Sequence, residues 1–394
     1  MFDGQFFGGN GTATLELITY HCLALGFIAS SFKSSKGKMT KQRTVEIFNT
    51  GVTTVSTYLL QAVLGMGISL LAVFVLRDFF PAAGVLLPFG YGQGTGQAMN
   101  YGSIYEELGF VGGKNFGLTI AALGFLSASI GGVIHLNILR RKGMAAPPSD
   151  KAETFTSEDI QGENEIPMQE SMDKMTVQVA LVVAAYMLAF FMMAGLGKLL
   201  PGMKATIYGF NFLLGVLSAT LIRTLLNFAN KKKIFRRAQV NDFLMTRTSN
   251  FFFDLMVVAG VAAIRLDKLQ DYWGIVLIMG VVGLVSTYAY NLWISKLLFP
   301  AYRQEQFLMM YGMLTGTAST GTILLREIDS EFKTPAADNM VYQNFPAIVF
   351  GFPLMLLATL APKEPYLTFG ILVAFFLVMN IILFRSFIFR RKKK

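Results

Sequence analysis

The sequence predicts an all-α polytopic membrane protein with about nine transmembrane spans, an inverted-topology repeat and two re-entrant hairpins. Three observations predict this fold class. Of the 394 residues, 53% are hydrophobic and 15% are charged, which is too little charge for a soluble protein of this length. The chain contains long uncharged runs. Two polar, glycine-rich stretches interrupt these runs in similar surroundings, one in each half.

The long uncharged runs predict transmembrane helices, because about 18 or more apolar residues are enough to cross a bilayer. Runs without a charged residue include Ile47–Leu76, Asn115–Leu139, Thr176–Gly197, Tyr272–Ser295 and Tyr366–Phe384. Four further stretches complete the predicted set: Thr12–Phe32, Ala205–Ile222, Thr248–Leu266 and Met340–Leu360. The lipid bilayer is therefore the expected environment of the chain.

The positive charges predict the orientation of these spans. Lysine and arginine gather in four clusters: Lys33–Arg43, Arg140–Lys142, Lys231–Arg237 and Arg390–Lys394. Because cytoplasmic loops are enriched in Lys and Arg, all four clusters and the C-terminus are expected inside. The same placement argues against nucleic acid as the partner of the +10 net charge.

Parity between the clusters requires two segments that dip into the membrane and return. Phe80–Tyr105 must enter from the outer side, and Gln306–Leu325 from the inner side. The expected organisation is a first repeat at 1–142 with a hairpin at 80–107 and a cytoplasmic linker at 143–174. A second, inverted repeat at 175–394 has a hairpin at 306–328 and an extra C-terminal helix. The linker is rich in Pro, Ser, Asp and Glu, without apolar periodicity.

The two hairpin tips are the predicted working part of the protein. Gly-Gln-Gly-Thr-Gly-Gln at Gly92–Gln97 and the hydroxyl-rich stretch Thr315–Thr322 are both flanked by apolar arms. Non-helical backbone at membrane depth is tolerated where it is buried or lines a watery cavity. Broken helices there expose N–H groups that can hold an anion and carbonyls that can hold a cation. The plainer alternative is that these small residues only allow close helix packing.

Residue types at the tips suggest their roles. The expected substrate contacts are Gln93, Gly94, Thr95, Gly96, Gln97, Asn100, Thr317, Ser319, Thr320 and Arg326. The expected ion contacts are Gly92, Thr315, Gly316, Thr322 and Asp254, with Na⁺ as the coupling ion and no transition-metal site. Two of these residues have a second interpretation: Asp254 as an interfacial residue, and Arg326 as a partner of Glu327 or Asp329 at the cytoplasmic rim.

At these residues the chain resembles the bacterial sodium/glutamate symporter family. The resemblance lies in Gly92–Gly96, Leu108–Phe110 and Phe116–Gly132 in the first half, and in Gly316–Thr322, Asn339–Met340 and Phe345–Pro346 in the second. It implies five-plus-five inverted helices, a homodimer, and sodium-coupled symport of glutamate or a related acidic amino acid or carboxylate. It also implies a multi-pass protein of the bacterial inner membrane.

The chain departs from the family pattern in three places. Gln93 stands where the family hairpin has a histidine, Ala318–Thr320 replaces a Thr-Pro segment, and Tyr366–Phe384 is additional. The first span resembles the family's third helix, so we expect this chain to lack the family's first two helices, either because it is truncated upstream of Met1 or because the native protein is asymmetric.

Two other functions remain open from the sequence. A transporter of the same architecture could carry a different organic anion or couple to protons. An intramembrane serine hydrolase would use Ser319 as nucleophile and His135 as base. We expect no enzymatic activity, because the hydrolase interpretation leaves the first hairpin unexplained.

Overall fold

The computed structural model describes residues 12–33, 40–76, 78–144, 165–166, 173–201, 204–235, 237–265, 272–330 and 333–388. Over these residues the protein is helical, and the only β-type pairing is an isolated bridge between Glu165 and Ala238. Most of the linker at 143–174 lies outside the described residues. So do residues 34–39 and 390–394, which belong to two of the basic clusters.

Among the described residues, seven helices are long and apolar enough to cross a membrane, which supports a multi-pass membrane protein. They are α1 (Ala13–Ser31), α2 (Lys41–Val75), α4 (Gly113–Arg141), α6 (Lys174–Leu199), α8 (Asn211–Lys231), α10 (Trp273–Leu298) and α15 (Pro365–Leu383). Each corresponds to one of the predicted spans.

The other two predicted spans are helical but do not meet this criterion, one because of its composition and the other because of its length. Thr248–Leu266 was expected to span; its helix, α9 (Asp242–Ala262), starts earlier and carries the charges of Asp242, Arg247 and Asp254. Met340–Leu360 is divided at Gln343 into α13 (Ala336–Tyr342) and α14 (Asn344–Leu360).

Residue contacts divide the chain into two compact units, at 1–36 with 150–262 and at 37–149 with 263–394. In the first unit, α1 packs against α6, α8 and α9, and the short α7 (Lys204–Gly209) packs against α6 and α8. This division cuts across the predicted repeats at 1–142 and 175–394. The contact units do not test the predicted repeats, because one contact unit can contain helices from both copies of a repeat when the two copies are interleaved.

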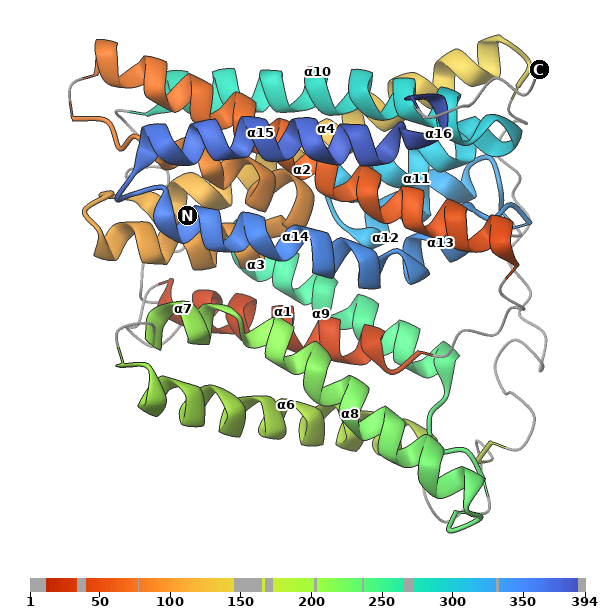
Figure 1. Cartoon of the computed structure of the whole chain (residues 1–394). Helices are drawn as coiled ribbons and strands as arrows, with labels where there is room; N and C mark the ends of the chain where they lie inside the picture. Colours follow the sequence, from red (N-terminus) through yellow and green to blue (C-terminus); the bar gives the residue numbers. More distant parts are fainter. Residues whose placement is uncertain are drawn as a thin grey trace. The chain divides into compact units, whose positions relative to one another are not determined.

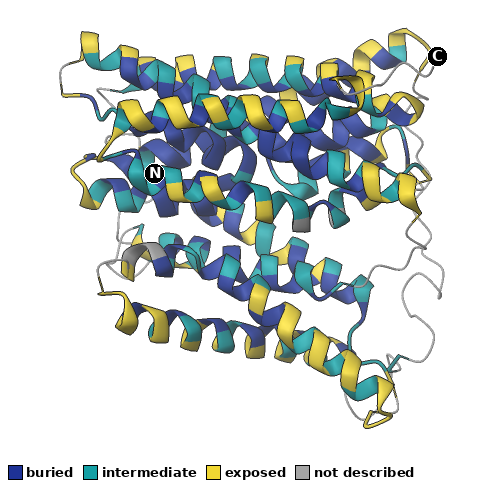
Figure 2. Cartoon of the chain, viewed as in Figure 1, coloured by how far each residue is buried: buried dark blue, intermediate teal, exposed yellow. Residues whose placement is uncertain are grey.

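The second unit contains both polar interruptions (Figure 1). After α2 come η1 (Ala83–Val85), α3 (Leu86–Glu107) and α4; after α10 come η4 (Pro300–Tyr302), α11 (Arg303–Thr315) and α12 (Ala318–Arg326). α13, α14, α15 and the short α16 (Arg385–Ile388) complete it. Figure 2 shows the buried residues in the middle of this unit, and α11 is buried from Gln306 to Thr315.

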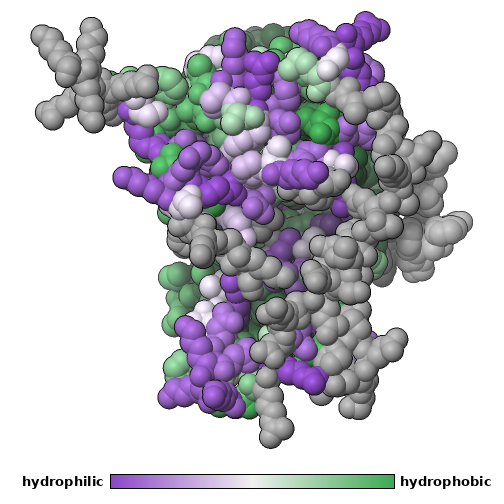
Figure 3. All heavy atoms as spheres, turned by 90° about the vertical axis from the view of Figure 1, so that its right-hand side faces the viewer, coloured by the Kyte–Doolittle hydropathy of each residue, from purple (hydrophilic) through white to green (hydrophobic). Residues whose placement is uncertain are grey.

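One end of the second unit gathers basic helix ends. α2 begins there, α4 ends there with Arg140 and Arg141, and α11 begins there with Arg303 (Figure 1, right). Figure 3 looks onto this end, and hydrophilic atoms gather on the part of the face formed by the second unit. The sequence predicts that these same ends are cytoplasmic.

Candidate functional site

The first polar interruption is a helical hairpin. α3 breaks at Gly94, whose φ of 81° and ψ of −173° lie in a region open essentially to glycine alone. The rings of Phe89 and Tyr101 stack with centroids 4.0 Å apart, although twelve residues of straight helix would separate them by about 18 Å. The two arms of α3 therefore lie side by side.

The second polar interruption is built in the same way. α11 ends at Thr315, the backbone is non-helical at Gly316 and Thr317, and α12 begins at Ala318. A Cβ on Gly321 would lie 2.5 Å from the carbonyl oxygen of Met309, so the second arm passes directly against the first. Thr317 caps the second arm by accepting a hydrogen bond from the Thr320 N–H.

The two hairpins meet at helix α4. Gly124 of α4 lies between them: a Cβ there would be 2.5 Å from the Thr315 carbonyl oxygen and 3.3 Å from Tyr91 Cα. One turn further on, the Ser127 hydroxyl is 2.9 Å from the Tyr91 hydroxyl of the first hairpin. The Ser127 carbonyl accepts a 2.8 Å hydrogen bond from Tyr311 of the second hairpin. Matching tyrosines of the two hairpins thus bind one residue.

Helix α2 supplies a second link between the hairpins. The Tyr58 hydroxyl donates a 3.1 Å hydrogen bond to the Gly92 carbonyl, close to the first break. One turn along, the Gln61 side-chain amide donates a 3.0 Å hydrogen bond to the Leu314 carbonyl, close to the second break. Each hairpin has a first arm before its break and a second arm after it. Gly92 and Leu314 both lie in the last turn of a first arm, where carbonyls lack intrahelical partners.

Helices α2 and α10 cross with a reciprocal pairing of polar side chains. Gln61 Nε2 donates a 2.9 Å hydrogen bond to Thr287 Oγ1, and Asn291 Nδ2 donates a 3.4 Å hydrogen bond to Thr57 Oγ1. Along α2 the threonine precedes the amide by four residues, and along α10 it does the same. Each threonine therefore meets the amide residue of the other helix, and the helices run antiparallel at the crossing.

The sequence carries a signal for this crossing that comparison of the hairpin tips alone missed. Val-Ser-Thr-Tyr occurs at Val55–Tyr58 and again at Val285–Tyr288, each followed three residues later by an amide, Gln61 or Asn291. The hairpins share a second pattern, Tyr-Gly-x-x-Thr-Gly-x-Ala, at 91–98 and 311–318. Searching for these ungapped repeats would have identified Gln61 and Thr287.

Two of the predicted substrate contacts have side-chain atoms without a hydrogen-bonding partner among the described residues. Gln97, in the first turn after the Gly94 break, is fully buried, and neither its Nε2 nor its Oε1 has a partner. The buried Ser319 Oγ, in the first turn after the second break, is also unpaired. Unsatisfied buried polar atoms are costly, and such groups concentrate at functional sites.

Other predicted contacts serve the hairpins themselves. The hydroxyls of Thr315 and Thr322 donate to carbonyls four residues back, and that of Thr317 caps α12. Gly92 allows the close approach of the Tyr58 ring. Gly94 forms the first helix break and Gly316 forms part of the second. The remaining predicted contacts lie on the same two hairpins, Thr95, Gly96 and Asn100 buried and Gln93 and Thr320 half-buried.

Two predicted residues are not brought to the breaks. Asp254 lies on α9 in the first unit, and its side chain is exposed. Arg326 is the exposed last residue of α12, about two turns beyond the second break. Of the partners proposed for Arg326, Glu327 pairs with Arg140 at 2.6 Å, and Asp329 accepts hydrogen bonds from Lys333 and Thr334.

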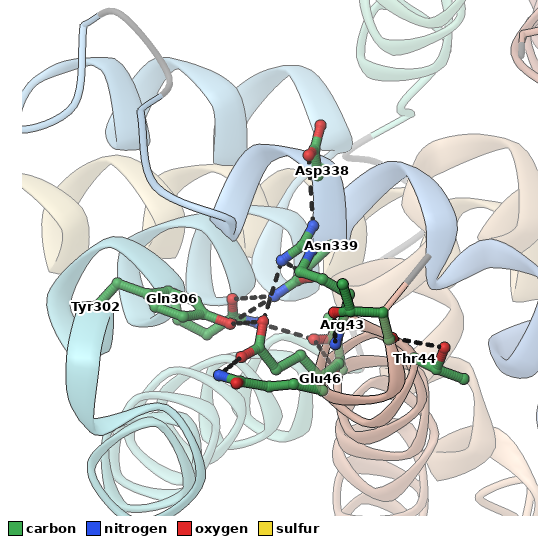
Figure 4. Close-up of polar contacts among 10 residues, drawn as sticks. Arg43, Thr44, Glu46, Tyr302, Gln306, Asp338 and Asn339 are labelled. Carbon is green, nitrogen blue, oxygen red and sulfur yellow. Dashed lines mark hydrogen bonds and ion pairs between the residues drawn. The ribbon is translucent and has the colours of Figure 1, made fainter. Parts of the chain in front are cut away.

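A polar network closes the basic end of the second unit (Figure 4). Glu46 of α2 accepts hydrogen bonds of 3.0 Å from Arg43 and from the Tyr302 hydroxyl. Asn339 of α13 accepts from Arg43 and donates to Tyr302 and Gln306. Burial is the largest cause that raises the pKa of Tyr302 above its ordinary value. The network ties the start of α2 to α11 and α13.

The opposite end of the same helices is closed by aromatic rings instead. Phe110 lies within 6.1 Å, centroid to centroid, of Phe79, Phe80, Phe116 and Tyr272. Phe80 also packs against Tyr105, so the first hairpin begins and ends in this cluster.

Comparison of the chain with models of protein families, with curated proteins and with solved structures gives no significant match.

Proposed function

We propose that this chain is a secondary active transporter built as an inverted-topology repeat, with α3 and α11–α12 as re-entrant hairpins. The observation that carries the proposal is the reciprocal pairing of Thr57 with Asn291 and of Thr287 with Gln61. Two equivalent segments that contact each other reciprocally are related by a two-fold axis. An antiparallel crossing puts that axis across the helices, as in transporters whose halves have opposite orientations.

The packing partners of the helices support the same axis. Under it, α2 corresponds to α10, α3 to α11–α12, and α4 to α13–α14. The contacts of α2 with α3 then correspond to those of α10 with α11, and those of α4 with α10 to those of α14 with α2. Helices α1 and α9, which become equivalent when α2 is paired with α10, also pack against each other.

The chemistry at the breaks supports an anionic cargo together with a cation. The second arms begin beside Gln97 and Ser319, and the N–H groups there carry partial positive charge that favours a carboxylate. The first arms end in carbonyls with partial negative charge, which favour a cation. We assign the substrate contacts to Gln97 and Ser319, and give Asp254 and Arg326 no direct role.

The cargo and coupling ion follow from the resemblance to sodium/glutamate symporters. We propose symport of glutamate, or a related acidic amino acid or carboxylate, with Na⁺ by alternating access. The protein would work as a homodimer in the bacterial inner membrane, with the basic end of the second unit and the C-terminus in the cytoplasm.

We favour transport over hydrolysis because of the contacts of His135. Its Nδ1 lies 2.7 Å from the Tyr288 hydroxyl and its Nε2 lies 2.9 Å from Gln304 Oε1. Both ring nitrogens are therefore engaged away from Ser319, whereas a serine hydrolase needs a nucleophile–base contact.

Uptake of labelled glutamate and dicarboxylates into proteoliposomes tests the proposal. We expect uptake driven by an inward Na⁺ gradient and lost when choline replaces Na⁺. Uptake that follows a pH gradient and ignores Na⁺ would select a proton-coupled transporter of the same architecture. If no acidic amino acid or dicarboxylate is taken up under either gradient, the proposal is wrong.

A further inference from the structure

The side chain of Gln61 occupies a distinctive position between the two breaks. It is fully buried on α2, and its Nε2 is held by Thr287 Oγ1 and by the Leu314 carbonyl at 2.9 and 3.0 Å. The acceptor Leu314 fixes the amide orientation, because an oxygen turned toward a carbonyl would be repelled. Gln61 Oε1 must therefore point to the other side.

That oxygen faces the first hairpin. A Cβ on Gly92 would lie 3.4 Å from Gln61 Oε1 and 2.2 Å from the Tyr58 ring, so the oxygen lies beside the backbone of the first hairpin close to its break. No donor among the described residues reaches Oε1, although the amide is fully buried. A buried acceptor without a donor destabilises the fold. Because Gln61 Oε1 faces the first hairpin without receiving a hydrogen bond there, we look for a bound ligand that is not part of either hairpin.

The surroundings favour a positively charged ligand. Gly92 and Leu314 lie in the last turns of the first arms, so both hairpins direct the negative ends of their helix dipoles toward α2. The atoms gathered there are amide, hydroxyl and carbonyl oxygens, the ligands that hard cations prefer. The unpaired Gln97 and Ser319 lie instead at the starts of the second arms, where an anion is favoured.

We propose that Gln61 Oε1, with main-chain carbonyls at the end of the first arm of the first hairpin, binds a monovalent cation, Na⁺. This inference rests on the proposed transport function and adds a location and a residue to it. Because the Nε2 of the same amide holds Leu314, a cation at Oε1 would join the first hairpin to the second through one side chain.

Thermal unfolding of the purified full-length chain in NaCl tests the site without any transport assay. Choline chloride keeps the ionic strength constant, and no organic substrate is added. We expect a saturable rise of the midpoint with Na⁺ in the wild type, and a half-saturating concentration at least about tenfold higher in Gln61→Leu. Thr220→Val is the control and should keep the wild-type value, because the Thr220 hydroxyl lies in the first unit and donates to the Val216 carbonyl of its own helix.

Gln61→Glu gives an independent test if Gln61→Leu fails to fold. Its carboxylate keeps an oxygen in place and adds negative charge, so we expect the half-saturating Na⁺ concentration to fall. The inference is wrong if the wild type shows no Na⁺-specific rise, or if neither substitution changes the half-saturating concentration. It is also wrong if Gln61→Leu weakens only the binding of amino acids relative to dicarboxylates, because Oε1 would then contact the substrate ammonium group.

The two proposals can fail separately. A chain that shows the Na⁺ response but takes up no acidic substrate keeps the cation site and loses the proposed cargo. A chain with Na⁺-driven uptake in which Gln61→Leu leaves the Na⁺ dependence unchanged keeps the function and loses this site.

Discussion

The side-chain amide of Gln61 and the hydroxyl of Thr287 are joined by a 2.9 Å hydrogen bond between fully buried side chains on two crossing helices. The two residues are 226 positions apart in the chain. Thr287 is equivalent to Thr57 in the repeated Val-Ser-Thr-Tyr segment, and Thr57 meets the other amide, Asn291. This contact therefore belongs both to the repeat and to the candidate site.

Thr287→Val should destabilise the protein by about 1 kcal/mol, because Gln61 loses one of its two acceptors. Combined with Gln61→Leu it should cost less than the sum of the single changes, with a coupling of about 0.5 kcal/mol or more. Unfolding free energies of the three variants measure this coupling. Thr220→Val is the control: the Thr220 hydroxyl bonds only the Val216 carbonyl of its own helix, so its effect should add to that of Gln61→Leu.

Gly94→Ala should destabilise the protein by about 1–3 kcal/mol and abolish transport. At φ 81° and ψ −173° a side chain is strained, and the break that separates the two arms would shift. Thermal midpoints and uptake measure the two effects. Gly195→Ala in α6 is the matched control, because a Cβ there has nothing within 4 Å; it should be neutral or stabilising by about 0.5–1 kcal/mol. Equal effects of both changes would contradict the assignment.

Gln97→Leu should separate binding from stability. The wild-type amide is buried without partners, so an apolar side chain of similar size should leave the thermal midpoint unchanged or raise it. If the amide contacts the substrate, the half-saturating substrate concentration should rise about tenfold or more. Substrate titrations and melting curves on the same preparation measure both quantities. Unchanged affinity would remove Gln97 from the site.

Glu46→Gln should loosen the polar network at the basic end of the second unit. Glu46 accepts hydrogen bonds from Arg43 and Tyr302, and its side chain is 15% exposed, so we expect a loss of about 1–3 kcal/mol. Hydrogen exchange at the start of α11 should increase at the same time. Thr44→Ala, two residues before Glu46, is the control. It removes only a hydrogen bond to the Thr40 carbonyl and should have little effect on either measurement.

A buried ion pair in the first unit gives a prediction independent of the site. Lys174 Nζ lies 2.9 Å from Glu165 Oε2, and the two side chains are only 1% and 9% exposed. Lys174→Met should cost about 3–5 kcal/mol because it leaves the buried carboxylate without its counter-charge, with Asn241 Nδ2 as a neutral donor at 2.6 Å. The double change Lys174→Met with Glu165→Leu should recover most of the loss. If the double variant is as unstable as the single one, the pair is not coupled as described.

The sequence located the two hairpin tips, but it did not locate the charged residues expected to act beside them. The tips at 92–97 and 315–322 were recognisable because glycines and hydroxyl residues interrupt apolar runs, and both coincide with breaks in helices. Asp254 and Arg326 were selected for their charge, and both are exposed away from the breaks. Charge in a sequence does not tell which way a helix face points.

The class of protein was determined by the sequence alone, because membrane insertion depends on apolar length and charge added along a continuous segment. In the part of the chain that the structure describes, seven helices, from Ala13–Ser31 to Pro365–Leu383, satisfy that local criterion. Only the tertiary structure decided which polar atoms are paired. The hydroxyls of Thr315 and Thr322 donate to carbonyls within their own helices, whereas the side-chain amide of Gln97 and the side-chain oxygen of Gln61 have no protein partner among the described residues. That difference depends on contacts between segments hundreds of residues apart, which no local pattern encodes.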